Sequence, residues 1–255
     1  MKTILITGCS SGFGRDIARH FLEHDWKVVA TMRTPQERVL PESDRLRVLP
    51  LDVTDAPSIR RVIDAAGPID ALVNNAGIGA AFPVELGSIK TTRQLFETNT
   101  FGTMAMTQAV LPQFRERGRG VIVNISSSTT LKPLPLLASY RASKAAVNAF
   151  TQCLALEVKQ LGVRVHLVLP GRAPETSFSA SGRQRMEGMD HEAYADVVQG
   201  LFDMFNDPGP TTRSRDVVDA VWRAVTDATS PMQLLAGVDA IEWAEASDSA
   251  SPRAD

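Results

Sequence analysis

The chain has 255 residues, of which 44% are hydrophobic and 22% are charged, and these proportions are typical of a globular protein. Its formal net charge of −2 gives no reason to expect a nucleic acid or a membrane surface as a partner. No apolar run approaches the roughly 18–20 residues of a membrane span, and the first glycine, Gly8, comes too early for a signal peptide.

No linker rich in Pro, Gly or Ser divides the chain, so we expect one domain over residues 1–244. Residues 245–255 are rich in Ser, Ala and Asp, and we expect them to form a disordered tail. The two cysteines, Cys9 and Cys153, are not expected to pair, and free thiols fit a reducing cytoplasm. We predict no metal site.

Residues 3–7 form a short apolar run that predicts a buried parallel strand. A Gly-x-x-x-Gly-x-Gly turn follows, and residues 15–22 then have the periodicity of a helix. In this context, backbone amides at a helix N-terminus can hold a pyrophosphate. The alternative is an ordinary turn with incidental glycines. The predicted phosphate-binding residues are Gly8, Ser10, Ser11, Gly12, Phe13 and Gly14.

The second predicted strand, residues 27–31, ends at the position that selects between two dinucleotides. An acidic side chain there would bind the adenosine ribose hydroxyls and select NAD. Met32 occupies that position, and Arg33 follows it. A cation without a carboxylate favours the 2′-phosphate of NADP, so we predict NADP, with NAD as the alternative. Arg33 could instead be one more surface arginine, and Arg15 is a weaker candidate for the phosphate.

Two further strands are predicted at residues 46–51 and 69–73, with a helix between them. Asp52 and Val53 come directly after the first of these strands. The second is followed by Asn74-Asn-Ala-Gly77. Asn and Gly are common in ordinary turns, so these four residues alone are a weak signal.

The most informative stretch runs from a strand at residues 121–123 to Lys144. A run of three serines follows the strand, and Tyr140 then precedes Lys144 by four residues. On a helix, this spacing places both side chains on one face, one turn apart. An ammonium beside a phenol favours the phenolate and lowers the phenol pKa from its usual value of about 10. The pair could then move the proton of an alcohol or carbonyl. The alternative is a half-buried aromatic residue beside a solvated lysine.

The glycine turn, the Asn-Asn-Ala-Gly element and Tyr140-Arg-Ala-Ser-Lys144 together resemble the short-chain dehydrogenase/reductase family over about residues 3–200. The resemblance implies a catalytic set of Ser127, Tyr140, Lys144 and Asn99. Ser127 is chosen among its neighbours because the family's serine lies thirteen residues before the tyrosine.

The resemblance also implies cofactor contacts along the chain. Asp52, next to Val53, would accept a bond from the adenine amino group. The expected contacts near the cofactor ribose are Asn75, Ala76, Gly77, Tyr140 and Lys144. In relatives, a threonine after the Pro170-Gly171 pair bonds the nicotinamide carboxamide. Thr176 is the candidate here, and Ser177 is a rival because this loop is one residue longer than usual.

Two long helices are predicted, over residues 89–115 and 139–161. By resemblance, the first is distorted at Asn99, where an exposed carbonyl holds a water that contacts Lys144. The second is apolar over more of its surface than one buried face requires. The resemblance implies that these helices pair in a homodimer or homotetramer, and a deeply buried helix is the alternative.

A sixth strand is predicted at residues 164–169. Beyond it, residues 178–206 carry several large apolar side chains, which we interpret as a lid over an apolar or bulky substrate. Plain core packing is the alternative. A helix over residues 216–225 and an edge strand over 232–235 complete the predicted elements.

Strands that alternate with helices predict an α/β fold with an open, doubly wound parallel sheet, the Rossmann fold. We expect an NADP(H)-dependent oxidoreductase that interconverts a carbonyl and a secondary or primary alcohol on a hydroxysteroid-, retinol- or lipid-like substrate. A 3-oxoacyl thioester reductase of the same family stays open, with Arg172, Arg183 and Arg185 as cations for a carrier protein. A dinucleotide-binding regulator without catalysis is another hypothesis, and the intact Ser, Tyr, Lys and Asn set argues against it. An epimerase or dehydratase of the extended relatives is the last hypothesis, and the absence of their Gly-x-x-Gly-x-x-Gly spacing argues against it.

Overall fold

Seven parallel strands form the central sheet, in the order β3-β2-β1-β4-β5-β6-β7. The computed structural model describes residues 1–36, 38–174, 176 and 182–250, with side chains as far as residue 247. The strands are β1 (Thr3–Ile6), β2 (Lys27–Met32), β3 (Leu46–Pro50), β4 (Ala71–Asn74), β5 (Gly120–Ile125), β6 (Val163–Pro170) and β7 (Gln233–Ala236). The fold is therefore the predicted Rossmann-type α/β fold.

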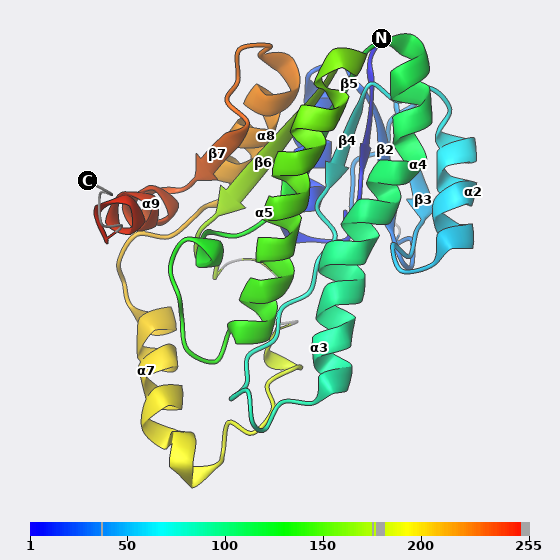
Figure 1. Ribbon diagram of the computed structural model, residues 1–255. Helices are drawn as coiled ribbons and strands as arrows, with labels where there is room; N and C mark the ends of the chain where they lie inside the picture. Colours follow the sequence, from blue (N-terminus) through cyan, green and yellow to red (C-terminus); the bar gives the residue numbers. More distant parts are fainter. Residues whose placement is uncertain (37, 175, 177–181, 251–255) are drawn as a thin grey trace.

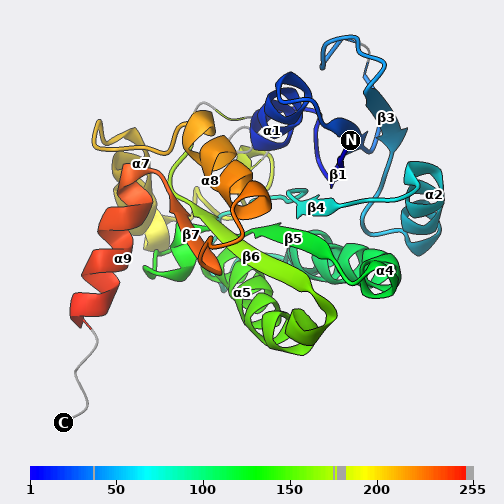
Figure 2. The ribbon, with the colours of Figure 1, turned by 90° about the horizontal axis from the view of Figure 1, so that it is seen from above.

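Helices cover both faces of this sheet, as Figures 1 and 2 show. One face carries α1 (Gly12–Glu23) and α8 (Ser214–Thr226), and the other carries α2 (Ala56–Ala66), α4 (Gly102–Arg117) and α5 (Ala138–Val158). The remaining α-helices of the described residues are α3 (Ile89–Leu95), α7 (Ala195–Asn206) and α9 (Val238–Ala250). Short 3₁₀ turns lie at Ser128–Thr130, Lys159–Leu161 and Glu192–Tyr194.

The two helical layers explain why the strand sequences are almost continuously apolar. Ile4 and Ile6 of β1 pack with the side chains of α1 and α8. Leu5, between them, packs on the opposite face with residues of α2, α4 and α5. Because successive strand residues point to opposite faces and both faces are covered, all three are fully buried.

The position of a ligand site follows from the strand order. β1 and β4 are neighbours at the centre of the sheet, and the chain winds outward from them in opposite directions. In doubly wound sheets, ligands bind in the crevice at the carboxyl ends of the strands where the winding reverses. The turns that follow β1 and β4 are therefore the expected place of a ligand site.

The long helix expected over residues 89–115 is present as α3 and α4, with a π-helical segment, η1 (Phe96–Phe101), between them. This segment contains Asn99, where a distortion was expected. The disordered tail expected from Glu245 is helical as far as Ala250, and residues 251–255 lie outside the described residues. The tail prediction relied on composition alone. The helix α9 begins before the tail, at Val238, and its first turns contain the apolar residues Ala240, Ile241 and Trp243. The helix then continues into the tail.

Among the described residues, no helix has both the length and the apolar character needed to cross a membrane. The same residues contain no group of three or more His, Cys, Asp or Glu side chains that could hold a metal ion. Cys9 is buried and Cys153 is exposed, and both are free thiols.

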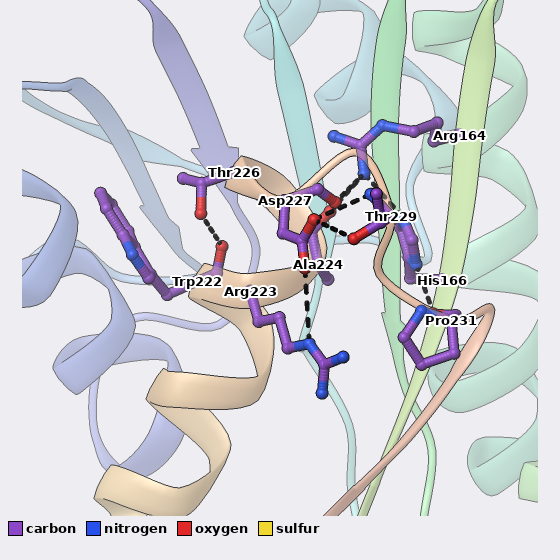
Figure 3. A network of polar contacts seen from close by, with 9 residues as sticks. All are labelled: Arg164, His166, Trp222, Arg223, Ala224, Thr226, Asp227, Thr229 and Pro231. Carbon is purple, nitrogen blue, oxygen red and sulfur yellow. Dashed lines mark hydrogen bonds and ion pairs between the residues drawn. The ribbon is translucent and has the colours of Figure 1, made fainter.

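A polar network fixes β6 to the end of α8 (Figure 3). Arg164 donates to the backbone carbonyls of Ala224, Val225 and Asp227 at 2.7–3.0 Å, which satisfies acceptors that a helix C-terminus leaves free. Its guanidinium also lies 3.0 Å from His166 Nε2. Arginine can only donate, so Nε2 accepts, and Nδ1 donates to the Pro231 carbonyl. Burial, helped by Arg164, lowers the pKa of His166 and keeps it neutral.

Candidate active site

The turn after β1 packs directly against the turn after β4. Gly8 has a φ of 75°, and a Cβ added there would lie 2.9 Å from Ala76 Cα. A Cβ at Gly14 would overlap the Gly8 carbonyl and the Asn75 side chain. Both positions therefore require glycine. This close packing leaves the N-terminus of α1 at the edge of the crevice.

Thr7 and Asn75 hold these two turns together. Thr7 Oγ1 accepts hydrogen bonds from the backbone N–H groups of Asn75 and Ala76 at 3.0 and 2.9 Å. Asn75 Nδ2 donates in return to the carbonyls of Thr7 and Gly8 at 2.9 and 3.1 Å. The side chain of Asn75 therefore fixes the glycine turn, in addition to lining the crevice.

A cavity of about 1280 Å³ runs along the carboxyl ends of the strands. Its lining includes almost every residue that the sequence predicted: Gly8, Ser10, Ser11, Gly12, Phe13, Arg33, Asp52, Val53, Asn75, Ala76, Gly77, Ser127, Tyr140, Lys144, Pro170, Gly171 and Thr176. The two other predicted residues, Gly14 and Asn99, are buried next to this lining. Arg172, Arg183 and Arg185 also line the cavity.

The N-terminus of α1 is suited to hold an anion. Ser11 is the N-cap residue, yet its side chain makes no capping hydrogen bond, and the first turn contains no acidic residue. The free amide groups and the positive end of the helix dipole therefore face the cavity without a competing charge. These residues fit the pyrophosphate of a dinucleotide, and the cavity volume exceeds that of most single small-molecule sites.

Tyr140, Lys144 and Ser127 meet at the middle of the cavity. Tyr140 lies in the first turn of α5, Lys144 lies one turn further on, and Ser127 follows β5. Tyr140 and Lys144 are 8% and 5% exposed. The Ser127 hydroxyl hydrogen-bonds with the phenol, and Lys144 Nζ donates to the Ile125 carbonyl at 3.0 Å.

Burial decides the charge state of the phenol. It raises the pKa of Tyr140 to about 12, and the hydrogen bond with Ser127 only partly opposes this rise. The expected lowering of the phenol pKa by Lys144 is therefore wrong, because lost hydration is the largest cause of the shift and raises the pKa. Burial also lowers the pKa of Lys144 to about 8. At pH 7 the site holds a neutral phenol, which can donate a proton, beside an ammonium.

Asn99 lies in η1, behind the acid–base residues, and is fully buried. Its Oδ1 accepts from the Ile78 N–H at 2.8 Å, and its Nδ2 donates to the Ile78 carbonyl and to Ser143 Oγ, both at 3.0 Å. A Cβ at Gly77 would lie 3.4 Å from Lys144 Nζ. Asn99 thus holds the chain after β4 close to the ammonium.

The helix distortion at Asn99 is present, as the resemblance implied. The Asn99 carbonyl accepts a hydrogen bond from Thr103 Oγ1 at 2.9 Å.

The loop after β6 closes one end of the cavity. Thr176 donates to the Ala173 carbonyl at 2.8 Å, and a Cβ added at Gly12 would lie 3.5 Å from Thr176 Cβ. Thr176 therefore lies against the glycine turn. The rival candidate Ser177 lies outside the described residues.

Arg33 and Asp52, the residues expected to contact the adenosine, line the cavity. Arg33 is exposed and follows the buried Met32, so no carboxylate occupies the end of β2. Asp52 Oδ1 accepts from the N–H and the hydroxyl of Thr54 at 2.9 and 2.7 Å, which leaves Oδ2 for a ligand. Arg15 is paired with Asp16 at 3.0 Å and is absent from the cavity lining.

Sequence reasoning missed several buried polar residues that support this site. Ser143 donates to the Tyr140 carbonyl at 2.7 Å and accepts from Asn99. Thr7 links the two central turns, and Thr212 and Asp239 contact the loop after β6. Ser143 lies inside the quoted Tyr140–Lys144 motif and Thr7 lies directly before the glycine turn, so their positions carried a signal. Thr212 and Asp239 are distant in sequence and carried none.

The wall opposite the glycine turn is apolar. A cluster of α7 and loop residues packs there, made of Ala81, Leu134, Leu136, Leu137, Met186, Met189, Tyr194, Val198, Leu201, Phe202 and Met204. Leu134, Leu137, Met186 and Phe202 of this cluster line the cavity, together with Phe205 and Trp243. The described part of the expected lid thus contributes an apolar surface.

The family model described as short chain dehydrogenase matches residues 2–187. The chain belongs to this family. The 3-ketodihydrosphingosine reductase of Bacteroides thetaiotaomicron is 40% identical over 174 residues, which are 67% of this chain and 63% of the reductase. Retinol dehydrogenase 8 of Bos taurus is 37% identical over 183 residues, which are 67% of this chain and 58% of that protein. The chain thus spans less than two thirds of the length of these curated relatives.

Solved structures share the whole fold. A short-chain dehydrogenase from Streptomyces avermitilis has a TM-score of 0.83 and 32% identity, and the match covers 96% of this chain and 91% of that one. A serine dehydrogenase complexed with NADP⁺ has a TM-score of 0.79 and 28% identity, covering 92% and 94%. A 3-ketoacyl-(acyl-carrier-protein) reductase from Brucella melitensis, complexed with NADH, has a TM-score of 0.78 and 28% identity, covering 92% and 96%.

The depressed pKa of Lys144 predicts a pH limit for the free protein. Because the ammonium loses its proton above a pH of about 8, kcat/KM for the cofactor should fall by roughly tenfold per pH unit well above that value. Steady-state rates from pH 6 to about 10 measure this limb. In Lys144→Arg the charge persists, so its weaker activity should lack the limb. A wild-type profile that stays flat to about pH 10 would contradict the assignment.

Proposed function

We propose that this protein is an NADP(H)-dependent oxidoreductase that interconverts a carbonyl and an alcohol on an apolar substrate. The observation that carries the proposal is the buried Tyr140–Ser127–Lys144 group, which faces the same cavity as the glycine turn and the α1 N-terminus. A protein that only bound a dinucleotide would not need a buried ammonium beside a phenol, because such a charge is costly to bury.

The bound nicotinamide would supply or accept the hydride. In the reductive direction, Ser127 orients the carbonyl oxygen, and the neutral Tyr140 donates its proton to that oxygen as the hydride reaches the carbon. Lys144 stabilises the phenolate that forms and contacts the nicotinamide ribose. Asn99 keeps the chain beside Lys144 in place and begins the path by which a proton returns from solvent. The raised pKa of Tyr140 supports reduction as the working direction at pH 7.

The preference for NADP rests on the end of β2. Arg33 lines the cavity, and the carboxylate that would repel a 2′-phosphate is replaced by the buried Met32. Arginine can bind a phosphate through two parallel hydrogen bonds. Similar structures contain NADP⁺ in one case and NADH in another, so the fold alone does not select one dinucleotide. In this proposal the choice between them depends on Arg33.

The substrate class follows from the apolar wall and the relatives. The side chains of Leu134, Leu137, Met186 and Phe202 form an apolar surface that suits the hydrocarbon part of a lipid-like substrate. The similar proteins named as a 3-ketodihydrosphingosine reductase and a retinol dehydrogenase support a lipid-like carbonyl or alcohol. A 3-oxoacyl thioester is the second candidate, because Arg183 and Arg185 line the same cavity.

The free thiols fit a cytoplasmic location.

We also propose that the protein is a homodimer or homotetramer that pairs through α5. The outer face of this helix exposes Ala142, Ala145, Ala149 and Leu156, and Leu156 is 79% exposed. Small side chains at helical spacing allow close approach of a second helix, and two-fold interfaces are the commonest in soluble oligomers.

The proton-donor role predicts the effect of Tyr140→Phe. With NADPH and a panel of lipid-like ketones, wild-type protein should consume reduced cofactor, and the variant should lose about 10²–10⁴-fold in kcat/KM. NADPH affinity, measured by fluorescence titration, should stay within about threefold, because the phenol ring and its packing remain. Full activity in the variant would show that another group donates the proton.

The cofactor assignment predicts a switch in Arg33→Asp. The ratio of kcat/KM for NADPH to that for NADH should fall at least about tenfold, because a charge-assisted contact is replaced by repulsion. Arg60→Asp is the control, since Arg60 is exposed on α2 and lies outside the cavity. Equal ratios in the two variants would remove Arg33 from the phosphate site.

The interface assignment predicts that Ala149→Arg yields monomers. Light scattering coupled to gel filtration should give at least twice the 27.6 kDa chain mass for the wild type and one chain mass for the variant. The buried charge would lack a partner across the interface. An unchanged mass would place the contact elsewhere.

A further inference from the structure

A buried polar pair lies behind the loop that follows β6. Thr212 precedes α8, and Asp239 lies in the first turn of α9, and each is 3% exposed. Neither residue belongs to the cavity lining. Both contact the backbone at Gly171 and Arg172, which do line it.

Hydrogen bonds fix this turn from one side. The Gly171 N–H donates to Thr212 Oγ1 at 2.8 Å and, over a longer distance of 3.3 Å, to the Ala236 carbonyl. The Arg172 N–H donates to Asp239 Oδ2 at 2.5 Å. The Thr212 N–H donates back to the Arg172 carbonyl at 2.7 Å. The hydroxyl of Thr212 has one proton, which it can donate to Asp239 Oδ1 at 2.8 Å or to the Ala236 carbonyl at 2.7 Å.

The packing of the pair against the turn is also close. A Cβ at Gly171 would overlap the Asp239 carboxylate. The carboxylate therefore occupies the space that a side chain would fill, and the turn cannot move toward it. A carboxylate that accepts charge-assisted bonds at a helix N-terminus is a strong anchor.

The side chain of Arg172 links the same turn to the apolar wall of the cavity. Its guanidinium donates to the Met204 carbonyl and, at 3.2–3.5 Å, to the carbonyls of Asp207, Gly209 and Pro210. These groups lie at and beyond the end of α7 (Figure 1), the helix that carries Phe202 and Phe205 into the cavity. A shift of Arg172 would therefore move the apolar wall as well as the loop.

We propose that Thr212 and Asp239 are positioning residues. They fix the Gly171–Arg172 turn and thereby align the cofactor end of the cavity with its apolar wall. The proposal rests on the proposed oxidoreductase function. It adds that Thr212 and Asp239, which do not line the cavity, control the distance between the hydride donor and the hydride acceptor. A small misplacement of reacting groups is enough to lower a rate by up to about a hundredfold.

Matched variants separate positioning from mere stability. Thr212→Val keeps the shape and removes the hydroxyl, and Asp239→Ala removes the carboxylate. Thr212→Ser keeps the hydroxyl. Asp239→Asn keeps an oxygen for the Arg172 N–H, while its amide can donate to Thr212 Oγ1, whose proton then goes to Ala236. The Val and Ala variants should therefore lose function, and the Ser and Asn variants should retain most of it.

Two readouts test this expectation. In cofactor-free protein, amide hydrogen exchange at Gly171 and Arg172 should accelerate at least about tenfold in Thr212→Val and Asp239→Ala. In turnover with NADPH, kcat should fall by roughly ten- to a hundredfold with a larger primary deuterium isotope effect, while the dissociation constant of NADPH changes less than about threefold.

Each outcome has a consequence for the proposal. Unchanged exchange at the two amides would overturn it, and so would faster exchange with normal kcat and isotope effect. If one variant does not fold, the other tests the same turn. If the wild type reduces no carbonyl, the oxidoreductase proposal fails, and the exchange experiment still decides whether the pair holds the turn.

Discussion

Burial of the Lys144 ammonium is the constraint on which the rest of the site depends. A charge that is 5% exposed is expensive to remove from water, so its surroundings must supply partners and tight packing. The Ile125 carbonyl accepts a hydrogen bond from this ammonium, and Asn99 holds the backbone at Ile78 so that Gly77 passes close by. The same dry environment keeps Tyr140 neutral. The protein thus holds an acid and a cation together before any cofactor arrives.

Ties between distant segments place this group beside the dinucleotide crevice. Thr7 and Asn75 bind the first glycine turn to the chain after β4. Asn99 joins that chain to α5 through Ser143. Thr212 and Asp239 bring the C-terminal elements onto the loop after β6. These hydrogen bonds are buried or partly buried. A buried polar group that loses its partner costs more free energy than the bond itself contributes, so the ties hold the shape of the cavity.

The sequence was sufficient for the fold and for most of the cavity lining, because glycine spacing, the Tyr140–Lys144 interval and alternating apolar runs are local signals. It failed where the outcome depends on tertiary context. The direction of the Tyr140 pKa shift depends on how much water the fold removes. The distortion at Asn99 was expected from the resemblance alone, because its partners Ile78 and Ser143 are distant in sequence. Asp239 could not be found, since only the fold brings α9 against Arg172.

The most direct test of this account is the ionisation of Tyr140 itself, which requires no knowledge of the substrate. The chain has only two tyrosines, so the tyrosinate absorbance of the wild type minus that of Tyr140→Phe isolates this phenol during a pH titration of the cofactor-free protein. The account predicts that the difference signal stays absent through neutral pH and rises only as the pH approaches about 12. A phenol that ionises near pH 7 would show that the ammonium, and not burial, sets its charge, and would contradict the account.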